Sequence, residues 1–197
     1  MRIKFITLLL TLSLTACGHV VTSNSLMEMK SEAVVKPEPG KALFIFHANS
    51  PASPVWLTST IWDITDRRAD PKLVSNLSSG MRSAYHVPPG EYDFMVLYLG
   101  YHEVMKAHVE ADKTYFVLVD TVSRAFKHAY KQFIPLGIGE KNEITATDVS
   151  VFKADIDEWY KDNLPSAIEH REKAYRSWEG WSAEERAKRT MDEEDGR

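Results

Sequence analysis

Short apolar runs separated by polar turns fill the middle of the chain. Between positions 41 and 152 apolar residues alternate with polar ones or fall in short blocks, without the 3.6-residue period of an amphipathic helix. Strands at this spacing, punctuated by glycine and proline, are typical of an antiparallel β-sandwich, and we expect an immunoglobulin-like or transthyretin-like domain over 41–152. The predicted strands are 42–48, 55–64, 72–77, 81–87, 91–99, 103–109 and 114–119, with one or two more within 124–134 and 143–151.

Two of these segments show opposite patterns of burial. The run 42–48 is apolar at nearly every position, which predicts a strand that is buried on both faces. The segment 91–99 instead alternates, so that its aromatic residues share one face. It follows Pro88-Pro89-Gly90, a turn signal, because proline fixes φ and glycine tolerates positive φ.

The spacing of apolar residues changes after Phe152. They now recur every three or four positions, which predicts an amphipathic helix. We therefore expect 153–197 to be a charged helical tail, with thirteen acidic residues against nine lysines and arginines. Pro165 lacks a backbone N–H and should break or kink the helix into two pieces that meet near Asn163.

A second helix start is visible near the end of the tail. Ser182-Ala183-Glu184-Glu185 resembles a capping box, which predicts a short helix beginning at Ala183. The last residues, 192–197, are polar and are expected to fray.

The first seventeen residues have the layout of an export signal. A short basic start precedes the apolar run 5–14, which is too short to span a bilayer. The run ends in Leu14-Thr15-Ala16-Cys17, which resembles the lipobox of bacterial lipoproteins. Residues 1–16 are therefore predicted to be a lipoprotein signal peptide, and Cys17 the lipidated first residue of the mature protein. An ordinary signal peptide with a chance cysteine, or an uncleaved anchor, is the alternative.

Cys17 is the single cysteine of the chain, so the fold must rest on its core rather than on a disulfide. Gly18 stands where inner-membrane lipoproteins of enterobacteria carry an aspartate, and we therefore expect the cell outer membrane, on its periplasmic side. Residues 17–40 are rich in Ser, Thr, Glu, Lys and Pro. We expect them to form a lipidated, semi-extended tether with little packed structure.

Net charge narrows the range of partners. The formal charge is -4 for the whole chain and -6 without residues 1–16, which hold Arg2 and Lys4 and no acid. Nucleic-acid binding needs an excess of lysine and arginine to displace phosphate counterions, and adsorption to anionic lipid needs the same. We therefore expect no nucleic-acid partner, and contact with the membrane through lipid on Cys17.

Two motifs in the predicted sandwich are similar to those of a known family. Residues 86–92 read His-Val-Pro-Pro-Gly-Glu-Tyr, and residues 111–117 read Ala-Asp-Lys-Thr-Tyr-Phe-Val. Together with the lipobox they resemble the bacterial lipoproteins grouped as the DUF2846 family, over roughly residues 40–120. Asp112 departs from the pattern, because the family usually has glycine there. The resemblance implies a β-rich envelope domain and assigns no catalytic residues.

The sequence shows no clear catalytic or cofactor motif. The histidines lack the spacing of zinc ligands, and neither a G-x-S-x-G nucleophile nor a glycine-rich phosphate loop occurs. Asp63, Asp66 and Asp70 fit a polar turn better than the carboxylate pair of a glycosidase. His102 and His108 could flank a site if a strand bend brought them together. We expect no catalytic residue, no metal and no cofactor.

Aromatic side chains remain as candidates for a binding surface. One group could form an exposed platform for sugar rings or could fill the core: Trp56, Trp62, Tyr98 and Tyr101. A second group could dock on the tail's own sandwich or bind a partner protein as a helix in a groove: Trp159, Tyr160, Trp178 and Trp181.

Together these patterns predict a non-catalytic, lipid-anchored cell-envelope protein that acts as a periplasmic binding or scaffolding module, with the tail contacting an envelope protein. A glycan- or peptidoglycan-binding module that stacks sugars on Trp56 or Trp62 is one alternative. The other is an envelope hydrolase that assembles histidine and aspartate residues from separate loops: His47, His86, His102 and His108 are its candidates.

Overall fold

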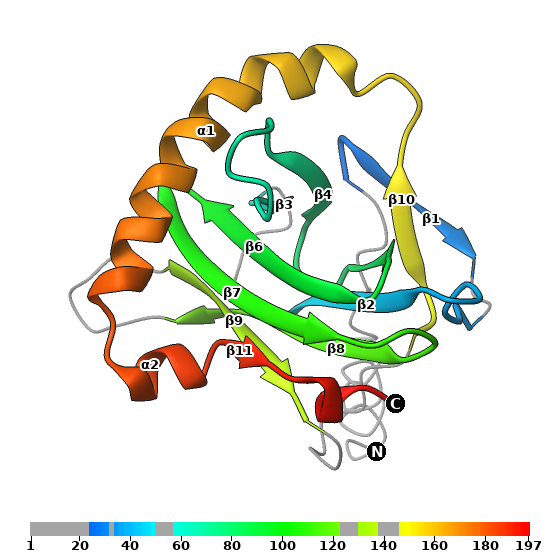
Figure 1. The fold of residues 1–197 in the computed structure, drawn as a ribbon. Helices are drawn as coiled ribbons and strands as arrows, with labels where there is room; N and C mark the ends of the chain where they lie inside the picture. The colour runs from blue at the N-terminus through cyan, green and yellow to red at the C-terminus, as the bar shows by residue number, and fades with distance from the viewer. Residues whose placement is uncertain (1–23, 32–33, 50–56, 123–129, 138–145) are drawn as a thin grey trace, which may run out of the picture.

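Two β-sheets packed face to face form the body of the computed structural model, which describes residues 24–31, 34–49, 57–122, 130–137 and 146–197 (Figure 1). The strands are β1 (Met27–Ser31), β2 (Ala42–Asn49), β3 (Ser59–Asp63), β4 (Lys72–Leu77), β5 (Arg82–Val87), β6 (Gly90–Tyr98), β7 (Tyr101–Val109), β8 (Thr114–Val122), β9 (Tyr130–Leu136), β10 (Val149–Phe152) and β11 (Thr190–Met191). The helices are α1 (Asp157–Gly180), α2 (Ala183–Ala187) and the 3₁₀ helix η1 (Glu193–Asp195). The described residues form a six-stranded sheet A, β1-β10-β5-β2-β8-β9, and a five-stranded sheet B, β11-β7-β6-β3-β4. The mainly β sandwich with a C-terminal helix is thus confirmed.

Both sheets are mixed: most neighbouring strands are antiparallel, as expected for this sandwich, but three pairs are parallel. β2 runs parallel to β8, β5 to β10 and β7 to β11, whereas the other neighbouring strands are antiparallel. Between β2 and β8 the chain builds most of sheet B, and such a long connection lets two neighbouring strands run in the same direction. The pattern of apolar residues indicates which faces of a strand are buried, but it does not indicate the direction of the neighbouring strands. The parallel pairs therefore could not be predicted from the sequence.

Aromatic rings fill the space between the two sheets. Phe44 and Phe46 of β2 meet Phe94 of β6 edge-on, with ring centroids 4.9 and 5.2 Å apart. The intervening residues of β2, Leu43 and Ile45, are equally buried on the outer face of sheet A. β2 is therefore buried on both faces, as its unbroken apolar run predicts.

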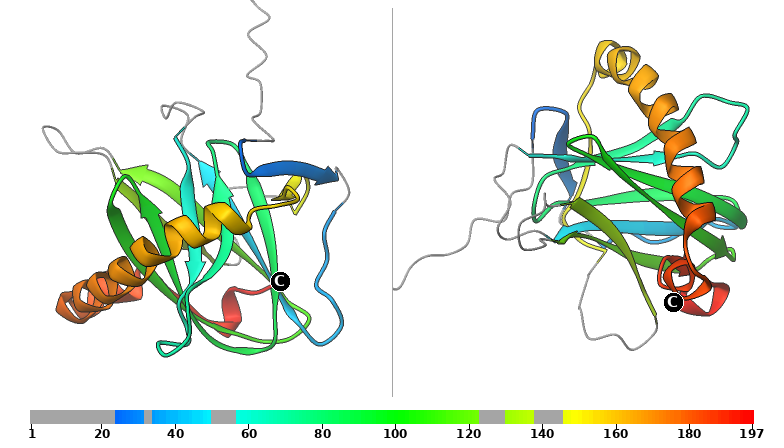
Figure 2. Two further views of the ribbon diagram at one scale, coloured as in Figure 1. Left: turned by 90° about the horizontal axis from the view of Figure 1, so that it is seen from above. Right: turned by 90° about the vertical axis from the view of Figure 1, so that its left-hand side faces the viewer.

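Helix α1 crosses the outer face of sheet B diagonally (Figure 2). It buries Ala174 and Tyr175 against Trp62 and Met95 of the sheet, and this layer forms a second core. The Tyr175 hydroxyl donates to the Ile64 carbonyl at 2.7 Å, which fixes the helix to the end of β3. Among the described residues, no helix combines the length and apolar character needed to cross a membrane.

Helix α1 continues through Pro165, and the predicted break near Asn163 is wrong. Proline removes a single backbone donor, the one that would bond to the Lys161 carbonyl four residues earlier. Lys161 and Pro165 both lie on the exposed side of the helix, where water can satisfy that carbonyl. Burial of the opposite face holds the helix together across the defect.

The C-terminal residues are packed rather than frayed, contrary to expectation. Helix α2 begins at Ala183 with the predicted capping box on Ser182. After β11, Arg197 exchanges two backbone hydrogen bonds with Thr114, of 2.7 and 3.0 Å. Gly196 lies so close to the Tyr115 ring that an added Cβ would come within 2.7 Å of it. These long-range contacts cannot be read from a polar local sequence.

Part of the predicted tether also belongs to the fold. β1 pairs with β10 at the edge of sheet A, and Met27 is 1% exposed. Asn24 closes the start of β1, because its side-chain oxygen accepts the N–H groups of Leu26 and Met27 at 2.9 and 2.8 Å. The packed domain therefore includes residues before position 41, and six residues separate Cys17 from Asn24. Cys17 and the predicted signal peptide lie outside the described residues.

Candidate functional site

The aromatic residues singled out in the sequence are largely internal. Trp62 is 1% exposed and lies under α1, with its ring centroid 6.4 Å from that of Trp159 and 5.9 Å from that of Tyr160. Tyr98 is also buried. Trp62 and Tyr98 therefore fill the core, which is the second of the two interpretations offered by the sequence, and Trp62 cannot stack a sugar ring. Trp56 lies outside the described residues.

The tail aromatics dock on their own domain as well. Trp178 is 8% exposed, and its ring lies 5.5 Å from that of half-buried Trp181. The Lys106 ammonium lies 5.6 Å from the Trp178 ring, and the Arg189 guanidinium lies 4.8 Å from that of Trp181. Of the two interpretations of the tail, docking on the sandwich holds, and these rings are not a free surface for a partner.

The histidines do not converge. His102 approaches His170 of α1, with their Nδ1 atoms 3.1 Å apart, whereas His108 pairs with Glu193 at 3.1 Å near the other end of β7. Burial, and then the neighbouring His170, lower the pKa of His102. The described residues contain no group of three histidine, cysteine, aspartate or glutamate side chains that could hold a metal ion.

The clustered aspartates have local structural roles. Asp63 accepts the Thr65 N–H at 3.0 Å, and Asp66 accepts the Arg68 N–H at 2.9 Å. Both bonds close turns after β3, which is the role that their spacing predicted. Asp63 also accepts the Tyr85 hydroxyl at 3.1 Å, which ties sheet B to sheet A.

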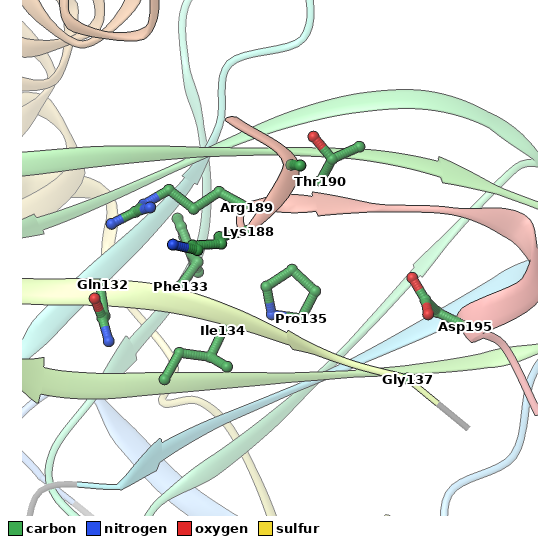
Figure 3. Close-up of a pocket in the computed structure, with 10 residues that line it drawn as sticks. Gln132, Phe133, Ile134, Pro135, Gly137, Lys188, Arg189, Thr190 and Asp195 are labelled. Atoms are coloured by element: carbon green, nitrogen blue, oxygen red, sulfur yellow. The ribbon is translucent and has the colours of Figure 1, made fainter. Parts of the chain in front are cut away.

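A polar hollow lies between β9, the edge strand of sheet A, and the C-terminal segment (Figure 3). We call it the edge slot; it has a volume of about 540 Å³. β9 and β11 end their respective sheets here and face each other without pairing. The lining residues are Gln132, Phe133, Ile134, Pro135, Gly137, Ala187, Lys188, Arg189, Thr190 and Asp195.

A buried ion pair holds the two walls of the edge slot together. Glu103 of β7 is 4% exposed, and one of its oxygens lies 3.0 Å from Arg189 Nε and accepts the Phe133 N–H at 2.8 Å. Burial raises the pKa of Glu103, while Arg189 and the Phe133 N–H act against that rise. Glu103 thus connects β7, β9 and the C-terminal segment.

The free edge of β9 is poorly suited to pairing with another strand. The Phe133 N–H points away from β8 and is taken by Glu103. Two residues on, the next outward position is Pro135, which has no N–H. With the outward donors at 133 and 135 removed, a peptide that pairs with this part of the edge would lack two neighbouring ladder bonds.

Side chains therefore determine what the edge slot can bind. Lys188 offers a donor and Asp195 an acceptor, both from the C-terminal segment, whereas Gln132 and Ile134 point to the side of β9 away from Lys188 and Arg189 (Figure 3). The described lining residues do not place a nucleophile beside a general base. This chemistry suits hydrogen bonding to a polar, uncharged or zwitterionic ligand segment rather than covalent catalysis.

Sequence reasoning missed the residues that build the slot. Glu103 and Arg189 are far apart in the chain, and no local motif links them. Lys131 was missed as well: it is 4% exposed, its ammonium donates to Thr121 Oγ1 at 2.6 Å, and burial lowers its pKa to about 8. Lys131 is the second residue of β9, and polar residues near strand ends are usually solvated, so its burial could not be predicted from the sequence.

Comparisons with known proteins give no match, either to a protein-family model or to a curated protein. The resemblance to the DUF2846 lipoproteins stays a prediction. Asp112, which stands where the family usually has glycine, has a φ of 60°. Glycine adopts this conformation with least strain.

Proposed function

We propose that the protein is a lipid-anchored, non-catalytic module of the cell envelope that binds or scaffolds a partner on the periplasmic side of the outer membrane. The observation that supports this proposal best is the lipobox at Leu14–Cys17, which follows a basic start and an apolar run. The packed domain begins six residues after Cys17. The attachment would be the diacylglycerol and acyl chains on Cys17, which together hold far better than one chain.

The binding site that we propose is the edge slot rather than the aromatic tail. Its volume is within the usual range for ligand pockets, and the C-terminal segment lines it with the polar side chains of Lys188, Arg189 and Asp195. An extended polar segment of an envelope protein is the ligand that this lining fits best, held through side-chain hydrogen bonds to Lys188 and Asp195.

Lipidation is tested by mass spectrometry of the mature N-terminus from membranes, together with density fractionation of inner and outer membranes. We expect an acylated Cys17 in the outer-membrane fraction, and a Cys17→Ser variant that keeps its signal peptide and carries no acyl chain. An N-terminus that begins elsewhere, without lipid, would remove the anchor from the proposal.

Binding is tested by in-cell photo-crosslinking from the full-length protein. A photoreactive residue replaces Lys188 in the edge slot, and a matched control replaces Glu172 on the exposed face of α1. A protein captured from position 188 but not from 172 supports the proposal. Capture of peptidoglycan instead would favour the glycan alternative at this slot, and capture at neither position argues against a binding role for it.

A further inference from the structure

The turn between β6 and β7 exposes an apolar tip. Leu99 and Gly100 join the strands with φ angles of 49° and 80°, and Leu99 is 66% exposed. Two positive φ angles are the signature of a type I′ hairpin, where asparagine followed by glycine is the favoured pair. Leucine is unfavourable here both in conformation and in solvation, and Tyr101 beside it is 42% exposed.

This tip lies at the end of sheet B where the chain enters the fold. The Asn24 side-chain amide donates to the Asn76 carbonyl of β4 at 2.9 Å. Asn76 pairs with Thr60 of β3, Thr60 pairs with Leu97 of β6, and Leu97 is two residues from Leu99. We call this the entry end of the domain.

A pocket of about 240 Å³ opens at the entry end and is lined by residues that run from Ser25 to the hairpin tip. Its thirteen described lining residues include leucines, Tyr98, Trp159 and small polar side chains, but no aspartate, glutamate, lysine or arginine. Charged residues make up 26% of the chain, so a neutral lining of this size is unusual for its surface.

The short tether keeps the entry end near any lipid on Cys17. Seven Cα–Cα steps separate Cys17 from Asn24, which limits the reach to about 25 Å even in a fully extended chain. A tether extending to residue 40 would have allowed about three times that reach. The entry end therefore cannot move far from the bilayer surface.

We propose that the entry end is a membrane-contact surface, with Leu99 and Tyr101 inserted into the interfacial layer of the bilayer that carries the Cys17 acyl chains. This proposal rests on the lipid anchor proposed above. Amphipathic rings and exposed leucines favour the headgroup layer, and a lining without charged side chains avoids the large cost of moving charges out of water. Because the mature chain is acidic, the contact is apolar rather than electrostatic.

The contact orients the whole domain. Thr190 in the edge slot pairs with Lys106 of β7, which pairs with Asp93 near the other end of β6. Insertion of the hairpin tip therefore turns the Thr190 end of the edge slot toward the periplasmic space, whereas Glu103, which contacts Phe133 and Arg189 at the other end of the slot, is two residues from Tyr101.

The test uses full-length, acylated protein reconstituted into vesicles of phosphatidylethanolamine and phosphatidylglycerol. Cys17 is the single natural cysteine and its thiol is acylated, so Leu99→Cys provides a unique site for a polarity-sensitive fluorophore. Glu91→Cys, exposed at the opposite end of β6, is the matched control, and Tyr101→Cys is a second probe of the tip. A nitroxide carried on the lipids quenches probes that lie at the bilayer.

We expect the labels at 99 and 101 to shift to the blue on vesicles and to be quenched about twofold more than the label at 91. Acylated, vesicle-bound protein whose tip labels behave as the control would overturn this inference and leave the anchor standing. Protein without acyl chains on Cys17 would overturn both. A blue shift that needs an added envelope protein would also overturn it, in favour of protein docking.

Discussion

At the scale of single residues, Glu103 is a buried charged group that joins β7 to β9 and to the C-terminal segment. It satisfies the Phe133 N–H and faces Arg189 while it is 4% exposed. Removing one partner of a buried pair leaves the other uncompensated, so we expect Glu103→Ala to lower the free energy of unfolding by about 3 kcal/mol. Denaturant unfolding measures this loss.

The isosteric variant separates charge from hydrogen bonding. Glu103→Gln keeps an acceptor for Phe133, and because burial already disfavours the charged form, we expect a loss of about 1 kcal/mol. Glu110→Ala removes an exposed carboxylate from the end of the same hairpin, together with its surface ion pair with Lys113, and should change stability little. Equal losses for the alanine and glutamine variants at 103 would show that the charge itself stabilises the fold.

His47 makes the stability of the domain depend on pH. Burial, with a smaller effect of Arg82, lowers its pKa from 6.5 to about 4, and its Nδ1 has no hydrogen-bond partner among the described residues. Because the folded pKa is below the unfolded one, the unfolded chain takes up a proton first as the pH falls. The neutral ring's contribution is therefore complete above about pH 7 and is lost between about 6.5 and 4.

Between pH 7 and pH 5 this linkage amounts to about 2 kcal/mol. We expect His47→Gln to lose about that much less stability than the natural protein over the same interval, as measured by urea unfolding at both values. His102 and His170, whose pKa values are also lowered, account for acid loss that remains in the variant. Identical pH profiles for the two proteins would show that His47 is not the responsible group.

At the scale of elements, α1 acts as a structural layer of the domain. Ala174 is 1% exposed where the helix meets sheet B. A carboxylate buried there has no partner, so we expect Ala174→Glu to destabilise the protein by more than about 3 kcal/mol. Arg176→Ala, on the exposed side of the same turn, should have no effect. Intrinsic fluorescence reports the change, because four of the five tryptophans line this layer.

Pro165 is a removable defect in that helix. Its side chain is exposed, and alanine would restore the hydrogen bond to the Lys161 carbonyl as well as helix propensity. We therefore expect Pro165→Ala to raise the free energy of unfolding by about 1 kcal/mol, whereas Ser166→Ala should change it little. A loss of stability on replacing Pro165 would mean that the ring shapes the helix in a way that the sheet requires.

The same elements show how much of the fold could be predicted from the sequence. Strand positions followed from short apolar blocks, as in the run from Leu43 to Phe46, and from alternation, as in 91–99; the start of α2 followed from its capping box, because all these signals are local. Three other features depend on partners far along the chain and left no local signal: the pairing of β1 with β10, the docking of Arg197 on Thr114 and the Glu103–Arg189 pair. For the candidate site, the sequence supplied aromatic residues that proved internal, and it missed the edge slot, which tertiary contacts create.

At the scale of the whole molecule, the two described chain ends close opposite sides of the sandwich. β1 ends sheet A beside β4, and β11 ends sheet B beside β9. A domain cut at position 41, where the sequence places its start, would lose β1 and expose the strands that it covers. We expect a soluble form that begins at Ser23 to fold, and one that begins at Gly40 to be unfolded or prone to aggregate, as judged by circular dichroism and gel filtration.

Two methionines on β1 test the same closure without cutting the chain. Met27 is 1% exposed and packs into the central core, whereas Met29 is 38% exposed. Met27→Ala leaves a cavity and should cost about 3 kcal/mol, while Met29→Ala should cost less than about 0.5 kcal/mol. If both cost equally little, β1 would be a loosely held part of the tether, its reach would extend well beyond 25 Å, and the argument that brings the entry end to the membrane would lose its geometric basis.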